Sequence, residues 1–219
     1  SNGCAFCIIP KLRGKYRSRS MESLLAEAKK MAGSGVKELI VIAQDITRYG
    51  LDLPEKTSLA QLVKELCRLD FHWIRLHYLY PEAITGELID VIVSEPKVLH
   101  YLDIPIQHCN DGILKAMRRR NTRAELEELF TKLRTAMPDV VIRTSLICGL
   151  PGEGEAEFEE LCGFLREQKL QRVGVFQFSP EEGTLAAAME DQVDPDTAAR
   201  RVELVVDLQS RIMDGYNEE

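Results

Sequence analysis

Long apolar runs are absent from this sequence. None of its 219 residues belong to an uninterrupted apolar stretch of the roughly 20 residues that a bilayer-spanning helix needs. The N-terminal region also lacks the charged and then apolar pattern of a secretory signal. We therefore expect a protein that spans no membrane and that works in the cytoplasm.

Positive charge is in the minority. The chain has 28 lysines and arginines against 35 aspartates and glutamates, which gives a net charge of −7. Such an acidic domain is poorly suited to broad binding of a polyphosphate, so its body is not expected to hold nucleic acid. The local exception is the basic run from Lys11 to Arg19. We interpret it as a solvated surface segment, and the alternative is an anion or RNA contact near a site.

The sequence lacks the dense cysteine content of a small disulfide-stapled protein, and a disulfide framework is not expected in a chain this long without secretion signals. The six cysteines are Cys4, Cys7, Cys67, Cys109, Cys148 and Cys162. Cys67 and Cys162 lie in apolar helical patterns, where buried thiols are common. We interpret Cys109 and Cys148, near expected strand ends, as packing residues too. Cys4 and Cys7 therefore become the candidates for chemistry.

Helical and strand patterns alternate along the whole chain. The expected strands are Val36–Ala43, Trp73–Tyr80, Leu99–Gln107, Val140–Cys148 and Val173–Phe178. The expected helices are Ser20–Ala32, Ser58–Leu69, Thr85–Val93, Asp111–Arg118, Thr122–Ala136, Glu155–Gln168 and Pro195–Met213. Alternation at this spacing predicts a parallel sheet with right-handed crossovers.

Side-chain alternation within the strands favours a barrel over a doubly wound sheet. In the fourth strand, Arg143 and Ser145 alternate with Ile142 and Leu146. Two other strands have a polar face as well, with Arg75 and His77 in one and Asp103 and Gln107 in the other. Strands covered by helices on both faces would be apolar throughout. We therefore predict an α/β fold that is an incomplete parallel (β/α) barrel, related to the TIM barrel, with a polar interior that holds a ligand.

The motif Cys4-Ala5-Phe6-Cys7 is the strongest chemical signal. Two thiolates at this spacing fit zinc, an iron–sulfur cluster or a redox disulfide, and chance spacing is a fourth reading. A zinc site needs a second Cys or His pair, which the sequence lacks. A thioredoxin-like motif belongs at a helix N-terminus, whereas Ile8, Ile9 and Pro10 follow here without an expected helix.

These residues resemble the end of a known signature. Gly3-Cys4-Ala5-Phe6-Cys7 is similar to the last part of the C-x3-C-x-aromatic-C motif of radical S-adenosylmethionine enzymes. The resemblance places a third cysteine just before Ser1. It implies that Cys4 and Cys7 are two of three thiolate ligands of a 4Fe–4S cluster, a soft-ligand site. It also implies that the fourth iron binds S-adenosylmethionine.

Further motifs resemble the methylthiotransferase subgroup of that family. They are Cys7-Ile8-Ile9-Pro10 with Arg13-Gly14, Asp103 to His108, Leu114 to Arg119, and Gly149-Leu150-Pro151-Gly152-Glu153. Three more resemble the branch that acts on a ribosomal protein: Gln44-Asp45 with Tyr49-Gly50, Trp73 to Pro81, and Ser179 to Thr184. The resemblance implies that S-adenosylmethionine is cleaved to a 5′-deoxyadenosyl radical. A methylthio group is then installed on the β-carbon of an aspartate in a small-subunit ribosomal protein. The alternatives are a tRNA adenosine methylthiotransferase and a non-catalytic barrel remnant.

The resemblance also sets expectations for what lies outside the chain. The first residue is Ser1 and the first methionine is Met21, so we expect a fragment. Residues 1–219 form the radical core and lack an N-terminal methylthiotransferase domain with a second 4Fe–4S cluster. A C-terminal RNA-binding-type domain is also expected outside it. The fragment alone is then inactive. We further expect a monomer that receives electrons from a flavodoxin or ferredoxin.

Arg143 and Ser145 are candidate cofactor-binding residues on the polar face of their strand. A buried guanidinium needs an anion, and the carboxylate of S-adenosylmethionine is one candidate. Asp103 or Glu82 would serve as a structural partner instead. Ser145 contacts the ligand or satisfies a neighbour.

Phe6, Gln44 and Gln107 complete the candidate cofactor-binding set. Gln44 and Gln107 end expected strands, where ligands bind in parallel α/β sheets. Phe6 either covers the cluster and touches the adenine or packs locally. His108 is interpreted as a ligand contact or as an ordinary capped histidine. No side chain is assigned a catalytic role.

Overall fold

The computed structural model describes residues 3–218. It divides into two compact units. Unit 1 comprises Ser1–Lys15, Ile106–Phe130 and Arg143–Glu219, and unit 2 comprises Tyr16–Pro105 and Thr131–Ile142.

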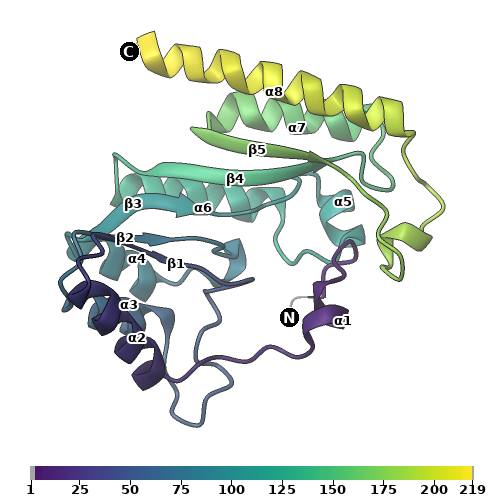
Figure 1. Cartoon of the computed structure of the whole chain (residues 1–219). Helices are drawn as coiled ribbons and strands as arrows, with labels where there is room; N and C mark the ends of the chain where they lie inside the picture. The colour runs from purple at the N-terminus through teal and green to yellow at the C-terminus, as the bar shows by residue number, and fades with distance from the viewer. Residues whose placement is uncertain (1–2, 219) are drawn as a thin grey trace. The chain divides into compact units, whose positions relative to one another are not determined.

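Five parallel strands form the sheet, in the order β1-β2-β3-β4-β5 (Figure 1). They are β1 (Glu38–Val41), β2 (Trp73–Leu76), β3 (Val98–Asp103), β4 (Val141–Cys148) and β5 (Arg172–Gln177). The helices are α1 (Ile9–Arg13), α2 (Met21–Gly33), α3 (Leu59–Cys67), α4 (Gly86–Ser94), α5 (Asp111–Ala116), α6 (Arg123–Ala136), α7 (Glu155–Gln168) and α8 (Pro195–Glu218). Two short 3-10 helices, η1 (Pro81–Ala83) and η2 (Ala186–Ala188), complete the list. The predicted parallel α/β architecture is confirmed.

Unit 2 is built from β1, β2 and β3 with α2, α3 and α4. The side chain of Ser58 accepts from the Gln61 N–H and the Gln61 side chain returns the bond, so α3 begins with a capping box. The apolar stripe of α3 is buried, with Leu62, Val63 and Leu66 among its core residues. α3 contacts both α2 and α4, and α4 packs against β3.

Unit 1 is built from β4, β5 and the helices around them. α8 contacts both α7 and β5, and the long C-terminal helix runs beside them in Figure 1. Asp194 accepts from the Thr197 N–H at 3.0 Å, so it caps α8. α7 begins at Glu155 and ends at Gln168, as its periodicity indicated.

The ends of two strands differ from the prediction by four residues each. β2 stops at Leu76 and β3 at Asp103, so the expected strands to Tyr80 and Gln107 were too long. Tyr78 has φ 64° and Gln107 has φ 73°. A left-handed residue breaks the alternation of a strand, which explains why both strands end before these positions.

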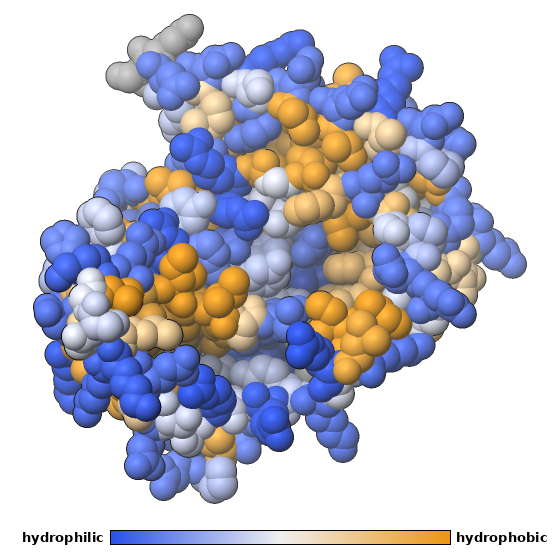
Figure 2. Space-filling model, in the orientation of Figure 1, coloured by the Kyte–Doolittle hydropathy of each residue, from blue (hydrophilic) through white to orange (hydrophobic). Residues whose placement is uncertain are grey.

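The strand faces are less polar than the sequence suggested. Ile40 in β1 and Phe176 in β5 are 48 % and 56 % exposed, and Figure 2 shows apolar side chains reaching the surface on the face in view. β4 does alternate as predicted, with Arg143 and Ser145 half-buried between buried neighbours. Within residues 3–218, none of the helices is long and apolar enough to cross a bilayer.

Candidate cofactor site

The Cys4–Cys7 segment is a tight loop held by backbone hydrogen bonds. The Cys7 N–H donates to the Cys4 carbonyl at 3.1 Å, which closes the turn. The Ala5 N–H donates to the Met117 carbonyl, and the Ala5 carbonyl accepts from the Ala186 N–H, both at 3.0 Å. The loop is therefore fixed on both sides, and its two thiols have a defined setting.

Arg119 is the side chain that the structure adds to this loop. Its Nη1 lies 3.8 Å from Cys4 Sγ, and the arginine is only 7 % exposed. A buried guanidinium favours a nearby anion, and thiolate is the anionic form of the cysteine side chain. Arg119 lay inside a motif quoted from the sequence, but no role was assigned to it there.

A helix does follow the cysteine motif, contrary to the expectation from the sequence. α1 begins at Ile9, two residues after Cys7, with Pro10 in its first turn. Proline is well tolerated there because its missing N–H would have no intrahelical partner. The position of a helix after the motif therefore does not decide between a redox disulfide and a metal site at Cys4 and Cys7.

Phe6 packs locally in the structure. A buried apolar cluster in unit 1 contains Ala5, Met117 and Leu150, and Phe6 packs against it together with Ile147. This cluster joins the cysteine loop to the C-terminal end of β4. Phe6 therefore has a structural role in packing. Its contact with adenine stays a prediction.

Gln107 and Ser145 lie side by side in unit 1. The Gln107 N–H donates to the Ser145 carbonyl, and the Gln107 carbonyl accepts from Ile147, both at 2.9 Å. Gln107 forms this bridge to β4 in a left-handed conformation. Strain at a non-glycine residue is typical of sites where the backbone is held for a function. The backbones of these two predicted residues are thus brought together.

Arg143 lies on the same strand as Ser145 and is half-buried. A Cβ added to Gly174, on β5, would meet Arg143 Nη2 at 3.7 Å. The guanidinium thus extends over a residue without a side chain. An alanine at position 174 would touch the guanidinium at an ordinary van der Waals distance.

Gln44 lies in unit 2, in the exposed segment after β1. Its neighbour Asp45 is buried, accepts from the Thr47 N–H at 3.0 Å and pairs with Arg48 at 3.4 Å. The Gln44-Asp45 motif thus contains one residue with a structural role and one exposed amide. The role of Gln44 as a ligand contact stays a prediction.

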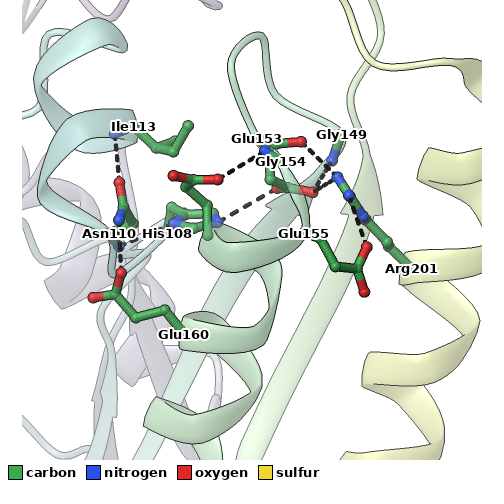
Figure 3. A network of polar contacts seen from close by, with 10 residues as sticks. His108, Asn110, Ile113, Gly149, Glu153, Gly154, Glu155, Glu160 and Arg201 are labelled. Carbon is green, nitrogen blue, oxygen red and sulfur yellow. Dashed lines mark hydrogen bonds and ion pairs between the residues drawn. The ribbon is translucent and has the colours of Figure 1, made fainter.

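A buried network of charged side chains lies at the turn that follows β4 (Figure 3). Glu153 Oε1 accepts from the Gly149 N–H and from Arg201 Nη1, both at 2.9 Å. His108 Nε2 lies 3.4 Å from Glu153 Oε2. Arg201 also donates to the Glu153 carbonyl at 2.7 Å. The network ties α8 to the turn that follows β4, and His108 is a structural residue within it.

The turn after β4 requires a glycine at position 149. Its φ is 81°, and a Cβ there would lie 2.4 Å from Ala198 Cβ on α8. Both the backbone conformation and the close approach of the helix require a residue without a side chain. The turn after β4 is therefore held by glycine geometry and by the Glu153 contacts together.

The remaining cysteines are packing residues, as the sequence suggested. Burial raises the pKa of Cys109 and of Cys148 to about 12. Burial also raises the pKa of Cys67 to about 11. Such thiols stay protonated near neutral pH and are poor ligands and nucleophiles.

The donor set of the loop fits part of an iron–sulfur site. Two thiols on a rigid turn beside a buried cation suit a soft, anionic cluster. Among residues 3–218, His, Cys, Asp and Glu side chains form no group of three that could hold a metal.

The buried Arg201 does leave a signal in the sequence, although no role is expected for it from the motifs. The buried positions of α8 are Ala198, Arg201, Val205 and Gln209. They recur every three or four residues, so Arg201 is a charged residue within the apolar stripe of a helix. A charge at such a position predicts a buried partner.

A family comparison agrees with the fold and with the cysteine loop. Residues 1–165 match the model of the Radical SAM superfamily. The chain belongs to this superfamily, whose members use a 4Fe–4S cluster and S-adenosylmethionine.

Among curated proteins, it is similar to "Ribosomal protein uS12 methylthiotransferase RimO" from several bacteria. Identity to the Caldanaerobacter subterraneus subsp. tengcongensis protein is 48% over 218 residues, which cover 99% of this chain and 50% of that protein. Identity to the Myxococcus xanthus protein is 51% over 211 residues, covering 96% and 44%. The chain thus spans about half the length of these relatives.

Solved structures share the fold at low identity. Coproporphyrinogen III oxidase (HemN) from Escherichia coli superposes with a TM-score of 0.66 at 18% identity, over 95% of this chain and 50% of that one. Methylornithine synthase (PylB) gives 0.62 at 15% identity, over 95% and 58%. These likenesses support the incomplete-barrel prediction and say nothing more specific.

Proposed function

We propose that this chain is the radical-generating core of a methylthiotransferase that modifies an aspartate of ribosomal protein uS12. The observation that carries the proposal is the similarity to RimO proteins over nearly the whole chain, at 48% identity for the Caldanaerobacter relative. The alternative substrate, a tRNA adenosine, has no observation in its favour. The same similarity argues against a non-catalytic remnant.

Cys4 and Cys7 would hold two irons of the cluster, with a third cysteine just before Ser1. A bound cluster and S-adenosylmethionine would supply the one-electron chemistry that removes hydrogen from an unactivated carbon. The backbone bonds of Ala5 fix the position of these thiols, which is the preorganisation that a reactive centre needs. Burial of Cys4 keeps bulk water from its sulfur.

The candidate cofactor residues would orient S-adenosylmethionine. Arg143 offers a fixed charge for a carboxylate, and charge-assisted bonds of this kind are the strong ones. Ser145 and Gln107, in the same unit, offer a hydroxyl and an amide for the polar groups of the cofactor. Phe6, packed at the end of β4, would shield the cofactor from solvent.

The rest of the protein is inferred from the length of the relatives, about twice that of this chain. We place a methylthiotransferase domain with a second 4Fe–4S cluster on the N-terminal side and an RNA-binding-type domain on the C-terminal side. Residues 1–219 alone would then be inactive. The protein would act as a monomer in the cytoplasm, reduced by a flavodoxin or ferredoxin.

Mass spectrometry of a deletion strain tests this function. Ribosomal protein uS12 should lose about 46 Da, the mass of one methylthio substitution, because the site and not the fold sets the substrate. Methylthio-adenosine in tRNA should stay at the wild-type level. Loss of the tRNA modification with intact uS12 would establish the alternative substrate.

A further inference from the structure

The turn that ends α5 both supports the cysteine loop and directs a cation toward it. The Arg118 N–H donates to Lys115 O at 3.0 Å and the Arg119 N–H to Leu114 O at 2.8 Å. This pair of bonds defines a Schellman motif, with position 118 in the left-handed conformation. Glycine is the usual residue there, but this chain has an arginine at φ 56°.

The left-handed conformation of Arg118 therefore costs conformational free energy that a glycine at this position would avoid. A left-handed non-glycine residue costs about 1 kcal/mol or more. The conformation sends the Arg118 side chain to solvent and places Arg119 at a buried position. It also leaves the Met117 carbonyl available for the Ala5 N–H. One strained turn thus fixes the cysteine loop and the guanidinium beside it.

We propose that Arg119 is a positioning residue that tunes the iron–sulfur cluster through the Cys4 sulfur. The inference rests on the proposed ligation of the cluster by Cys4 and Cys7. With Cys4 as a ligand, the Nη1–Sγ approach of 3.8 Å is a hydrogen bond from a cation to a cluster thiolate.

The expected direction of tuning follows from charge. Reduction adds an electron to a cluster that is already anionic through its thiolates. A buried positive charge and a hydrogen bond to a ligand sulfur both stabilise the reduced form, and both raise the midpoint potential. Screening by water is weak because Arg119 is 7 % exposed. Arg119 therefore makes the cluster easier to reduce.

The test measures midpoint potentials in the anaerobically reconstituted full-length protein. The electron paramagnetic resonance signal to follow is the one that changes when S-adenosylmethionine is added, because only a cluster with an open iron responds in that way. Arg119→Met should shift its midpoint to a more negative potential. Arg119→Lys, which keeps the charge, should shift it less. Arg118→Met is the matched control, because it removes an exposed charge from the neighbouring residue, and it should leave the potential unchanged.

Iron and sulfide contents and melting temperatures separate this role from a structural one. An Arg119→Met protein with full iron content and the wild-type potential would overturn the inference, however far its melting temperature falls. If Arg119→Met does not retain the cluster, Arg119→Gln and Arg119→Lys provide the comparison, and equal potentials in those two would overturn it. Absence of the responsive cluster from the wild type would instead overturn the proposed function, and this inference with it.

Discussion

The thiols of the cysteine loop and the thiols of Cys109 and Cys148 lie in two different environments. Cys4 and Cys7 lie in a turn beside the buried Arg119. Cys109 and Cys148 are wholly buried, with Glu160 and Glu153 nearby, and both the burial and these charges raise the pKa of each thiol. Environment, and not distance along the sequence, therefore separates a ligand thiol from a packing thiol.

The ion pairs of the protein also differ in how far they are buried. The Arg201–Glu153 pair is buried and bonded to backbone on both sides. The His100–Asp139 pair in unit 2 is at the surface, with Asp139 73 % exposed. The first pair should be needed for the shape of the turn after β4, and the second should matter little.

The largest expected effect concerns the thiols. Cys4→Ala or Cys7→Ala should remove the S-adenosylmethionine-responsive cluster from the full-length protein, a loss of about four irons and four sulfides. Cys109→Ala and Cys148→Ala should keep it, because those thiols stay protonated. Iron and sulfide analysis after reconstitution measures the difference. Full retention of iron in Cys4→Ala would show that the division between the two environments is wrong.

The second effect concerns the buried pair. Arg201→Met leaves the Glu153 carboxylate buried without its cation, and should lower the free energy of unfolding by about 3 kcal/mol. Adding Glu153→Gln should restore much of this, because the amide oxygen still accepts from the Gly149 N–H. Denaturant unfolding measures both, and exposed Arg200→Met is the control. Equal effects of Arg200→Met and Arg201→Met would remove the contrast between buried and exposed charges.

The third effect concerns binding and not folding. Arg143→Ala should weaken S-adenosylmethionine binding by about 2–3 kcal/mol if its guanidinium holds the ligand carboxylate. Calorimetric titration of the reconstituted protein gives the affinity, and a melting curve gives the stability. Normal affinity with a much lower melting temperature would assign Arg143 to a structural pairing.

Periodicity predicted the regular elements because it reports burial. The bounds of α7 and the Asp194 cap of α8 follow from apolar spacing and from cap chemistry. The Cys4–Cys7 spacing likewise located the candidate metal ligands before any fold was known.

The sequence did not predict the features that depend on tertiary contacts. Gln107 and Arg118 are ordinary residues whose left-handed backbones are imposed by the bonds around them. Local propensity disfavours that conformation, so no pattern in the sequence reveals it. The Arg119–Cys4 contact joins residues 115 positions apart. A pairing over such a distance follows only from the folded chain.

The smallest expected effect concerns the surface pair in unit 2. His100 Nδ1 lies 2.6 Å from Asp139 Oδ1, and this hydrogen bond lowers the pKa of Asp139. A lowered pKa in the folded state stabilises the protein above the ordinary carboxyl pKa, and the contribution is lost as pH falls through the lowered value. Because Asp139 is exposed, Asp139→Asn should change the free energy of unfolding by less than about 0.5 kcal/mol at about pH 6. At a pH below the lowered pKa, where the carboxyl is protonated in both states, variant and wild type should differ even less. Urea unfolding from pH 6 down into the acid range measures this, and a loss at pH 6 as large as that of Arg201→Met would mean that exposure does not govern the strength of these pairs.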